Sequence, residues 1–128
     1  MRDNSGFPDS ANILAPMTSG NLFTALAPAA AERCEVLASA PGTRVERIVS
    51  WGQASPPDFW YDQDEDEWVA LLSGRARLIL RDPDATVELA PGDWLRIAAH
   101  RRHRVDWTPA DVATVWLAVF MRAADDPT

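Results

Sequence analysis

The sequence predicts an all-β domain, an antiparallel barrel or sandwich, and three observations carry this prediction. After residue 42 the apolar residues come in short runs. Turn-forming residues, such as Ser-Gly, Asp-Pro-Asp and Pro-Gly-Asp, separate these runs about every eight to ten residues. The run RARLILR at 75–81 alternates, so that Ala76, Leu78 and Leu80 share one face, which is typical of a half-buried strand.

The residues before this region have a different texture. Residues 1–20 are rich in Ser, Gly, Asn, Asp and Pro and show no period, so we expect a flexible arm. Residues 21–42 contain helix formers with apolar spacing, and Asn21 is able to cap a helix. Because Pro28 interrupts the pattern, we expect a short turn followed by a helix over about 29–38.

The barrel itself is expected to span residues 43–122, followed by a C-terminal tail at 123–128. Apolar or alternating runs place its strands at 43–51, 67–72, 75–81, 86–89, 94–98, 103–107 and 114–121. A chain of 128 residues is long enough for one such core and too short for two.

Charge and composition exclude several classes of partner. The net charge is −7 and the pI is near 4.6, which argues against nucleic acid or an anionic membrane surface as a partner. The longest apolar run, at 115–121, is far shorter than the ~18 residues of a membrane span. Cys34 is the single cysteine, so no internal disulfide forms. The N-terminus lacks the apolar run of a signal peptide, so we expect a cytoplasmic protein.

One histidine and one glutamate stand out on the predicted strands. In HRVDW the alternation puts His103 on the same face as Val105 and Trp107, pointing into the interior. An interior imidazole is either satisfied by a carbonyl or a buried acid, or it binds a metal. Glu67 begins a strand whose later residues are all apolar, so its carboxylate is either exposed at the rim or turned inward and paired.

These residues carry a resemblance to the cupin family. Glu67, six intervening residues and Gly74 resemble the second half of the first cupin motif, which normally begins with His-x-His. The stretch APGDWLRIAAHRRHRV resembles the second motif, with its Pro-Gly-Asp turn and a later histidine. The resemblance covers about residues 43–121 and implies a small jelly-roll barrel with a ligand or metal inside. In this alignment Glu67 and His103 fall on metal-binding positions.

The first motif departs from the family pattern. In one register its two histidine positions fall on Trp60 and Asp62, and in the other on Tyr61 and Gln63. The resemblance therefore implies Glu67 and His103 as metal ligands, with Asp62 or Gln63 as a third oxygen donor. Such a set would suit a weakly held divalent metal such as Zn, Fe, Mn or Ni.

The six tryptophans suggest a second kind of site. One interpretation is packing of the core and of a dimer interface. The other is an aromatic pocket around Glu67 and His103, suited to a flat or cationic small molecule. Trp116, which has no polar neighbour in sequence, is expected to be plain core. The predicted ligand-binding residues are Trp60, Tyr61, Trp68, Trp94 and Trp107.

Two functions are compatible with these features. The first is a binding or sensing barrel for a small molecule. The second is a small metal-dependent enzyme of the dioxygenase, isomerase or lyase type, and the missing histidines favour the first. The resemblance also implies a homodimer, because small cupins commonly pair through a sheet edge.

Overall fold

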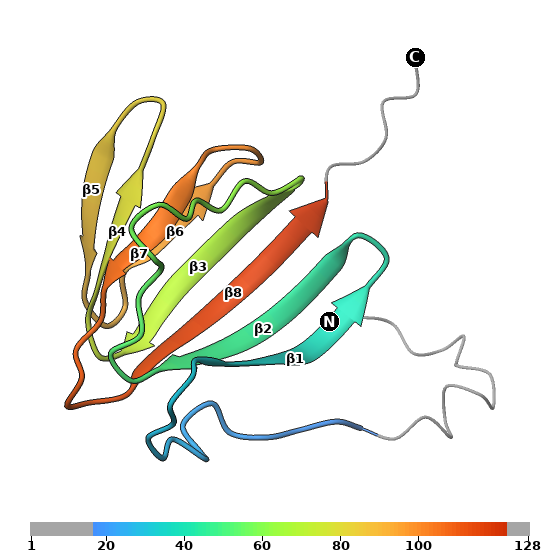
Figure 1. Cartoon of the computed structure of the whole chain (residues 1–128). Helices are drawn as coiled ribbons and strands as arrows, with labels where there is room; N and C mark the ends of the chain where they lie inside the picture. Colours follow the sequence, from blue (N-terminus) through green and yellow to red (C-terminus); the bar gives the residue numbers. More distant parts are fainter. Residues whose placement is uncertain (1–16, 123–128) are drawn as a thin grey trace, which may run out of the picture.

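The computed structural model describes residues 17–122 and contains, within them, eight β-strands and no helix (Figure 1). The strands are β1 Arg33–Ala40, β2 Thr43–Ser50, β3 Glu65–Ser73, β4 Ala76–Leu80, β5 Ala85–Leu89, β6 Trp94–Ile97, β7 His103–Trp107 and β8 Thr114–Arg122. The expected tail at 123–128 and most of the expected arm at 1–20 lie outside the described residues.

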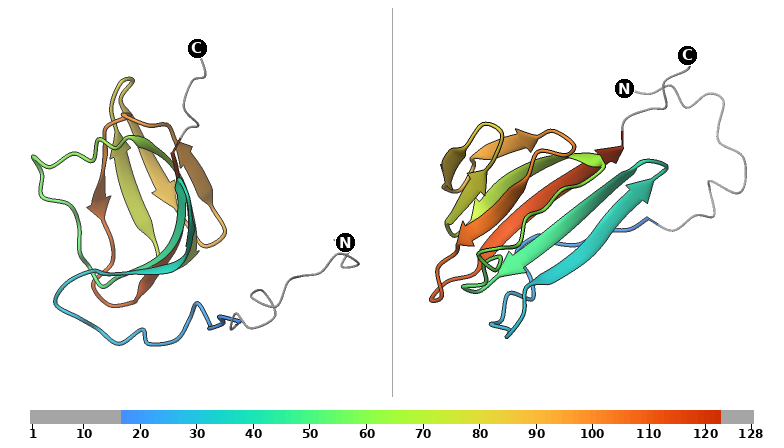
Figure 2. Two further views of the ribbon diagram at one scale, coloured as in Figure 1. Left: turned by 90° about the vertical axis from the view of Figure 1, so that its right-hand side faces the viewer. Right: turned by 45° about the horizontal axis from the view of Figure 1, so that its top comes forward.

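The strands form two antiparallel sheets that face each other. One sheet has the order β1-β2-β8-β3-β6 and the other has the order β5-β4-β7. The two sheets curve around a shared interior, as the left view of Figure 2 shows. The predicted all-β jelly-roll fold is confirmed, since non-consecutive strands pair across the barrel and enclose one core.

The core lies between the inner faces of the two sheets. On β4 the alternation expected from RARLILR holds, with Ala76, Leu78 and Leu80 all buried. On β8 the inward residues Trp116, Ala118 and Phe120 pack against them. Burial of these side chains is the main stabilising contribution to a barrel of this size.

The expected N-terminal helix is wrong. Residues 33–40 form β1, which pairs antiparallel with β2 and extends the sheet before the boundary expected at residue 43. All eight residues of β1 are exposed, so main-chain hydrogen bonds to β2 hold the strand rather than an apolar face. An isolated helix of about ten residues is marginal in water, and the free edge of β2 offers this segment a full set of partners.

Side chains of the first two strands and of the loop after them hold the preceding segment against the sheet. Arg33, Arg47, Trp51 and Gln53 each donate a hydrogen bond to main-chain carbonyls within residues 22–29. Three buried residues of the outer sheet face pack against Leu26 and Trp51 at this place; they are Val49, Ala113 and Val115. The segment therefore has a defined path without any regular secondary structure.

Residues 17–122 contain no helix with the length and apolar character of a membrane span.

Candidate functional site

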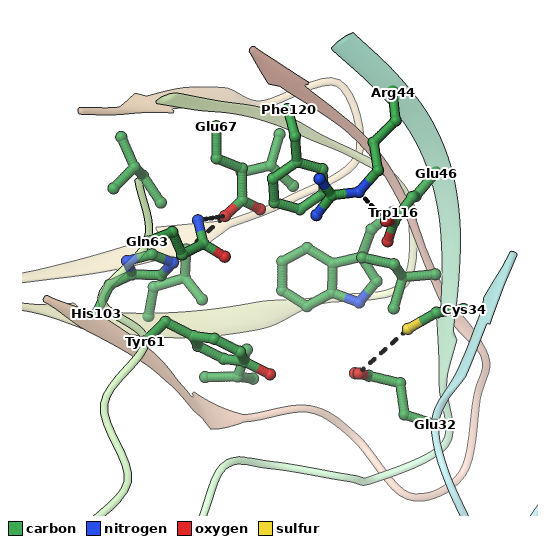
Figure 3. A pocket seen from close by; sticks show the side chains of 15 residues that line it. Glu32, Cys34, Arg44, Glu46, Tyr61, Gln63, Glu67, His103, Trp116 and Phe120 are labelled. Atoms are coloured by element: carbon green, nitrogen blue, oxygen red, sulfur yellow. Dashed lines mark hydrogen bonds and ion pairs between the residues drawn. The ribbon is translucent and has the colours of Figure 1, made fainter. Parts of the chain in front are cut away.

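A cavity of about 220 Å³ lies between the two sheets (Figure 3). Its walls are apolar in the middle, where Trp116 and Phe120 of β8 face the interior. Polar side chains gather at its two ends. His103, Glu67, Gln63 and Tyr61 lie at one end, and Glu32, Cys34, Arg44 and Glu46 lie at the other.

At the first end of the cavity the side chains of His103 and Glu67 contact each other. Glu67 points inward because it shares its face of β3 with the buried Val69 and Leu71. His103 begins β7 opposite Leu80 on β4, also on the inner face. The imidazole Nε2 lies 3.3 Å from a Glu67 carboxylate oxygen, and both residues are at least nine-tenths buried. The structure thus brings together the two residues that the sequence singled out.

The hydrogen bonds of His103 fix which ring nitrogen carries a proton. Nδ1 lies 2.9 Å from the main-chain carbonyl of Arg101, which can only accept, so Nδ1 donates. In the neutral ring Nε2 therefore presents a lone pair to Glu67, and in the protonated ring it presents a second N–H. Burial alone would lower the pKa of His103, but the Glu67 hydrogen bond, the Arg101 carbonyl and the Glu67 charge together raise it. The gap between Nε2 and the carboxylate therefore attracts a proton or another cation.

Gln63 and Tyr61 complete this end. The Gln63 amide nitrogen lies 3.4 Å from the same Glu67 oxygen. Tyr61 exchanges two main-chain hydrogen bonds with His103, and its ring stacks on the imidazole at 5.4 Å between centroids. Of the two possible registers of the first motif, the one that places Tyr61 and Gln63 at the histidine positions faces the cavity.

Asp62 lies outside this arrangement. Its carboxylate is 2.7 Å from Nδ1 of the exposed His100, which also approaches Asp64 at 3.3 Å. The main-chain N–H of His100 donates to the carbonyl of Gln63. Asp62 thus helps to hold the loop that carries Gln63, and its side chain is not directed at Glu67.

The four predicted ligand-binding tryptophans all lie away from the cavity. Trp68 follows Glu67 on β3 and so points to the outer face, where its ring lies next to that of Trp94, with 6.1 Å between centroids and the planes tilted by 30°. Trp94 is 61% exposed. The ring of Trp60 lies beneath the Arg81 guanidinium at 4.6 Å instead of lining the interior.

Trp107 is turned outward by an irregularity in β7. Leu78 pairs with Val105 and Arg77 pairs with Trp107, so β7 has one extra residue, Asp106, at this point. Such a bulge reverses the alternation that follows it. Val105 still lines the cavity, whereas Trp107 lies on the outside beneath the Arg77 guanidinium at 5.7 Å. The expectation that Trp107 shares the face of His103 is corrected accordingly.

Trp116 is the tryptophan that does line the cavity. It is 4% exposed, as expected of core, and its ring forms the middle of the wall. Its indole N–H donates to the Ser50 hydroxyl at 3.2 Å, and that hydroxyl donates to a Glu32 oxygen at 2.9 Å. A buried relay therefore links the wall to a carboxylate at the second end of the cavity.

None of the residues at the second end of the cavity is among those predicted from the sequence. A usable signal for Arg44 and Glu46 was the alternation in TRVERIVS, which puts both on one face with Ile48. Glu32 and Cys34 gave no such signal, because their segment was expected to be helical.

The donor set at the first end fits a weak metal site and does not fit a tight one. Within residues 17–122 no group of three or more His, Cys, Asp or Glu side chains is arranged to hold a metal ion. His103 and Glu67 offer one nitrogen and one oxygen, and Gln63 offers an amide oxygen. Tightly bound zinc takes at least three strong protein ligands.

The comparisons with known proteins agree with this fold. The cupin domain family model matches residues 47–120, which is more than half of the chain. The chain belongs to the cupin domain family. No curated protein matches this cupin.

Solved structures resemble this cupin over most of its length. One, from Ralstonia eutropha JMP134 and provisionally named a mannose-6-phosphate isomerase, is 46% identical, covers 84% of this chain and 100% of its own, and has a TM-score of 0.80. A cupin superfamily protein from Desulfitobacterium hafniense DCB-2 is 17% identical over 84% of this chain and 94% of its own, with a TM-score of 0.66. The structure named FeII HppE is 16% identical, covers 70% of this chain and 50% of its own, and has a TM-score of 0.60. The last two share the fold alone.

Proposed function

We propose that the barrel interior binds a small organic molecule, anchored by the His103–Glu67 pair. The observation that carries this proposal is a cavity whose wall holds a buried imidazole and a buried carboxylate 3.3 Å apart. Binding pockets are mostly apolar with a few convergent polar groups, and this cavity has that composition. Its volume of about 220 Å³ is below the ~300–1,000 Å³ of drug-sized pockets, so the ligand is small.

A divalent metal is a second occupant for the gap between His103 and Glu67. These two residues would hold it, and Gln63 would add a third donor if its amide rotated to bring the oxygen to the side where the nitrogen now faces Glu67. The metal would supply Lewis-acid chemistry to the bound molecule. The short donor set makes this a weak site that keeps several waters.

The alternative function is an enzyme that moves a proton on the bound molecule. The His103 imidazole and the Glu67 carboxylate lie 3.3 Å apart at the cavity wall, which is an arrangement that a general acid and base can use. The provisional isomerase name of the 46% identical relative favours testing this reaction class. Incubation with small hydroxy-aldehydes and ketones in deuterium oxide would reveal it as deuterium incorporation, which Glu67→Gln should abolish.

Binding itself is tested with a variant that fills the cavity. Val105 is half-buried and lines the cavity, so Val105→Phe should reduce its volume. Val45 is also half-buried but pairs with Val119 on the outer face, which makes Val45→Phe the matched control. In an NMR screen with single-ring fragments, we expect hits on the wild type and on the control that Val105→Phe loses. Hits that survive Val105→Phe would refute the barrel interior as the binding site.

The homodimer and the cytoplasmic location stay predictions. β1 is an exposed edge strand, and an edge of this kind offers main-chain groups for pairing with a second copy. Sedimentation of the purified protein over a range of concentrations measures the oligomeric state directly.

A further inference from the structure

The second end of the cavity is built by residues that precede the family-matched region. Glu32, Cys34, Arg44 and Glu46 all line the cavity, and all lie before residue 47. They come from the start of β2, from β1 and from the residue just before β1. This end is therefore built by N-terminal elements that lie outside the residues matched by the family model.

Glu32 is held at the cavity by buried groups. Ser50, which is completely buried, donates to one Glu32 oxygen at 2.9 Å and accepts from the Trp116 indole. Within the described residues, the other Glu32 oxygen has one hydrogen-bond partner, the Cys34 thiol at 3.9 Å. One carboxylate oxygen is thus fixed by the protein, and the second is available to a ligand.

The charge at this end is negative. The Arg44 guanidinium donates to Glu46 and, at 2.6 Å, to Glu65, and it stacks over Phe120 at 4.1 Å. Its positive charge is already compensated by these two carboxylates, and Glu32 adds a third. An arginine with two carboxylate partners is a poor anchor for a further anion.

The Cys34 thiol is affected by the same charges. Cys34 is exposed as a residue, but partial desolvation of its thiol at the cavity, followed by the charges of Glu32 and Glu46, raises its pKa to about 11. The thiol stays protonated at neutral pH, so it is neither a nucleophile nor a thiolate ligand here. A negative potential that disfavours a thiolate favours a cation in the same place.

We infer that the end of the cavity lined by Glu32 and Glu46 binds a positively charged group of the ligand, an ammonium or a guanidinium. The ring of Trp116 lines the cavity next to this end, and aromatic rings attract cations over their faces. The inference deepens the proposed function and rests on it, since it names the ligand class of the same cavity. It also separates this chain from an enzyme for sugar phosphates, because a phosphate at this end would meet an excess of carboxylates.

Three single-ring probes of similar size test the charge preference. At pH 7.5 benzylamine is a cation, benzyl alcohol is neutral and benzoate is an anion, and each is small enough for the cavity. By NMR titration we expect benzylamine to bind about tenfold more tightly than benzyl alcohol and benzoate to bind more weakly than both. Glu32→Gln should reduce the preference for benzylamine over benzyl alcohol about tenfold and leave the affinity for benzyl alcohol unchanged.

Glu88→Gln is the matched control. Glu88 on β5 is 68% exposed and does not line the cavity, so this variant makes the same change in net charge elsewhere. It should keep the preference for the cation. If benzyl alcohol binds in the cavity but the three probes bind equally, or if Glu32→Gln behaves as Glu88→Gln does, the inference is overturned and the proposed function stands. If no probe binds, both fail.

Discussion

Removing the Ser50 hydroxyl should destabilise the protein through one orphaned N–H. Ser50 is completely buried, and its hydroxyl is the acceptor of the Trp116 indole N–H at 3.2 Å. In Ser50→Ala that N–H stays buried without a partner, which costs about 1–3 kcal/mol. The hydrogen bond from Ser50 to Glu32 is lost as well, but the exposed Glu32 carboxylate can bind water instead. Against a total stability of perhaps 5–15 kcal/mol this loss is readily measured.

A second substitution distinguishes this cause from a general loss of packing. Trp116→Phe removes the indole N–H and leaves a smaller ring, so by itself it costs about 1–3 kcal/mol. In the double variant no orphaned donor remains, because both hydrogen-bond partners are gone. We therefore expect the double variant to lose about 1 kcal/mol less than the sum of the two single losses.

Urea denaturation gives the free energies of unfolding, provided that the four proteins share one m value. Ser39→Ala is the control, since Ser39 is an exposed residue of β1 and its replacement should change stability by less than about 0.5 kcal/mol. Additive losses within about 0.5 kcal/mol would refute the reasoning, because they would show that the indole N–H is not left unpaired.

Three further predictions follow from the site and its turns. In metal-free protein the pKa of His103, measured by NMR, should lie above the ordinary 6.5, and Glu67→Gln should lower it. Because the folded-state pKa is raised, the stabilisation from this pair is complete below pH 6.5 and is lost as the pH rises through the folded-state pKa. Gly74 and Gly92 both have a positive φ, but a Cβ at Gly74 would lie 2.7 Å from a main-chain atom while one at Gly92 meets nothing. In thermal melts Gly92→Ala should cost about 1–2 kcal/mol and Gly74→Ala about 1–3 kcal/mol more, so equal losses would contradict the close approach. Finally, Mn²⁺ added to the protein should wash out on dialysis against a chelator, and a stoichiometric metal that survives would show a donor set stronger than the one described.

The barrel strands could be predicted because their patterns are local. The alternation in RARLILR and the turn after it depend on nearby residues alone, and both are present in β4 and β5. The conformation of residues 33–40 could not be predicted from a local pattern. It is decided by the free edge of β2, which is a partner that no local pattern reveals.

The site was predictable only as far as strict alternation holds. Glu67 and His103 lie where alternation places them, and Trp107 does not, because the extra residue Asp106 reverses the phase of β7. Trp116 appeared to be plain core because the hydroxyl that it contacts, on Ser50, lies far away in sequence. Contacts of this kind become visible only when the sheets are assembled.

The hydrogen bonds that fix residues 22–29 against the sheet predict which substitutions the protein tolerates there. Arg33, Arg47, Trp51 and Gln53 all donate to main-chain carbonyls, and every residue type supplies a carbonyl. Most side chains of the segment can therefore be exchanged without releasing it, whereas each of the four donors is specific. In a mutational scan we therefore expect substitutions of the four donor residues to displace this segment, and substitutions within residues 22–29 to be tolerated.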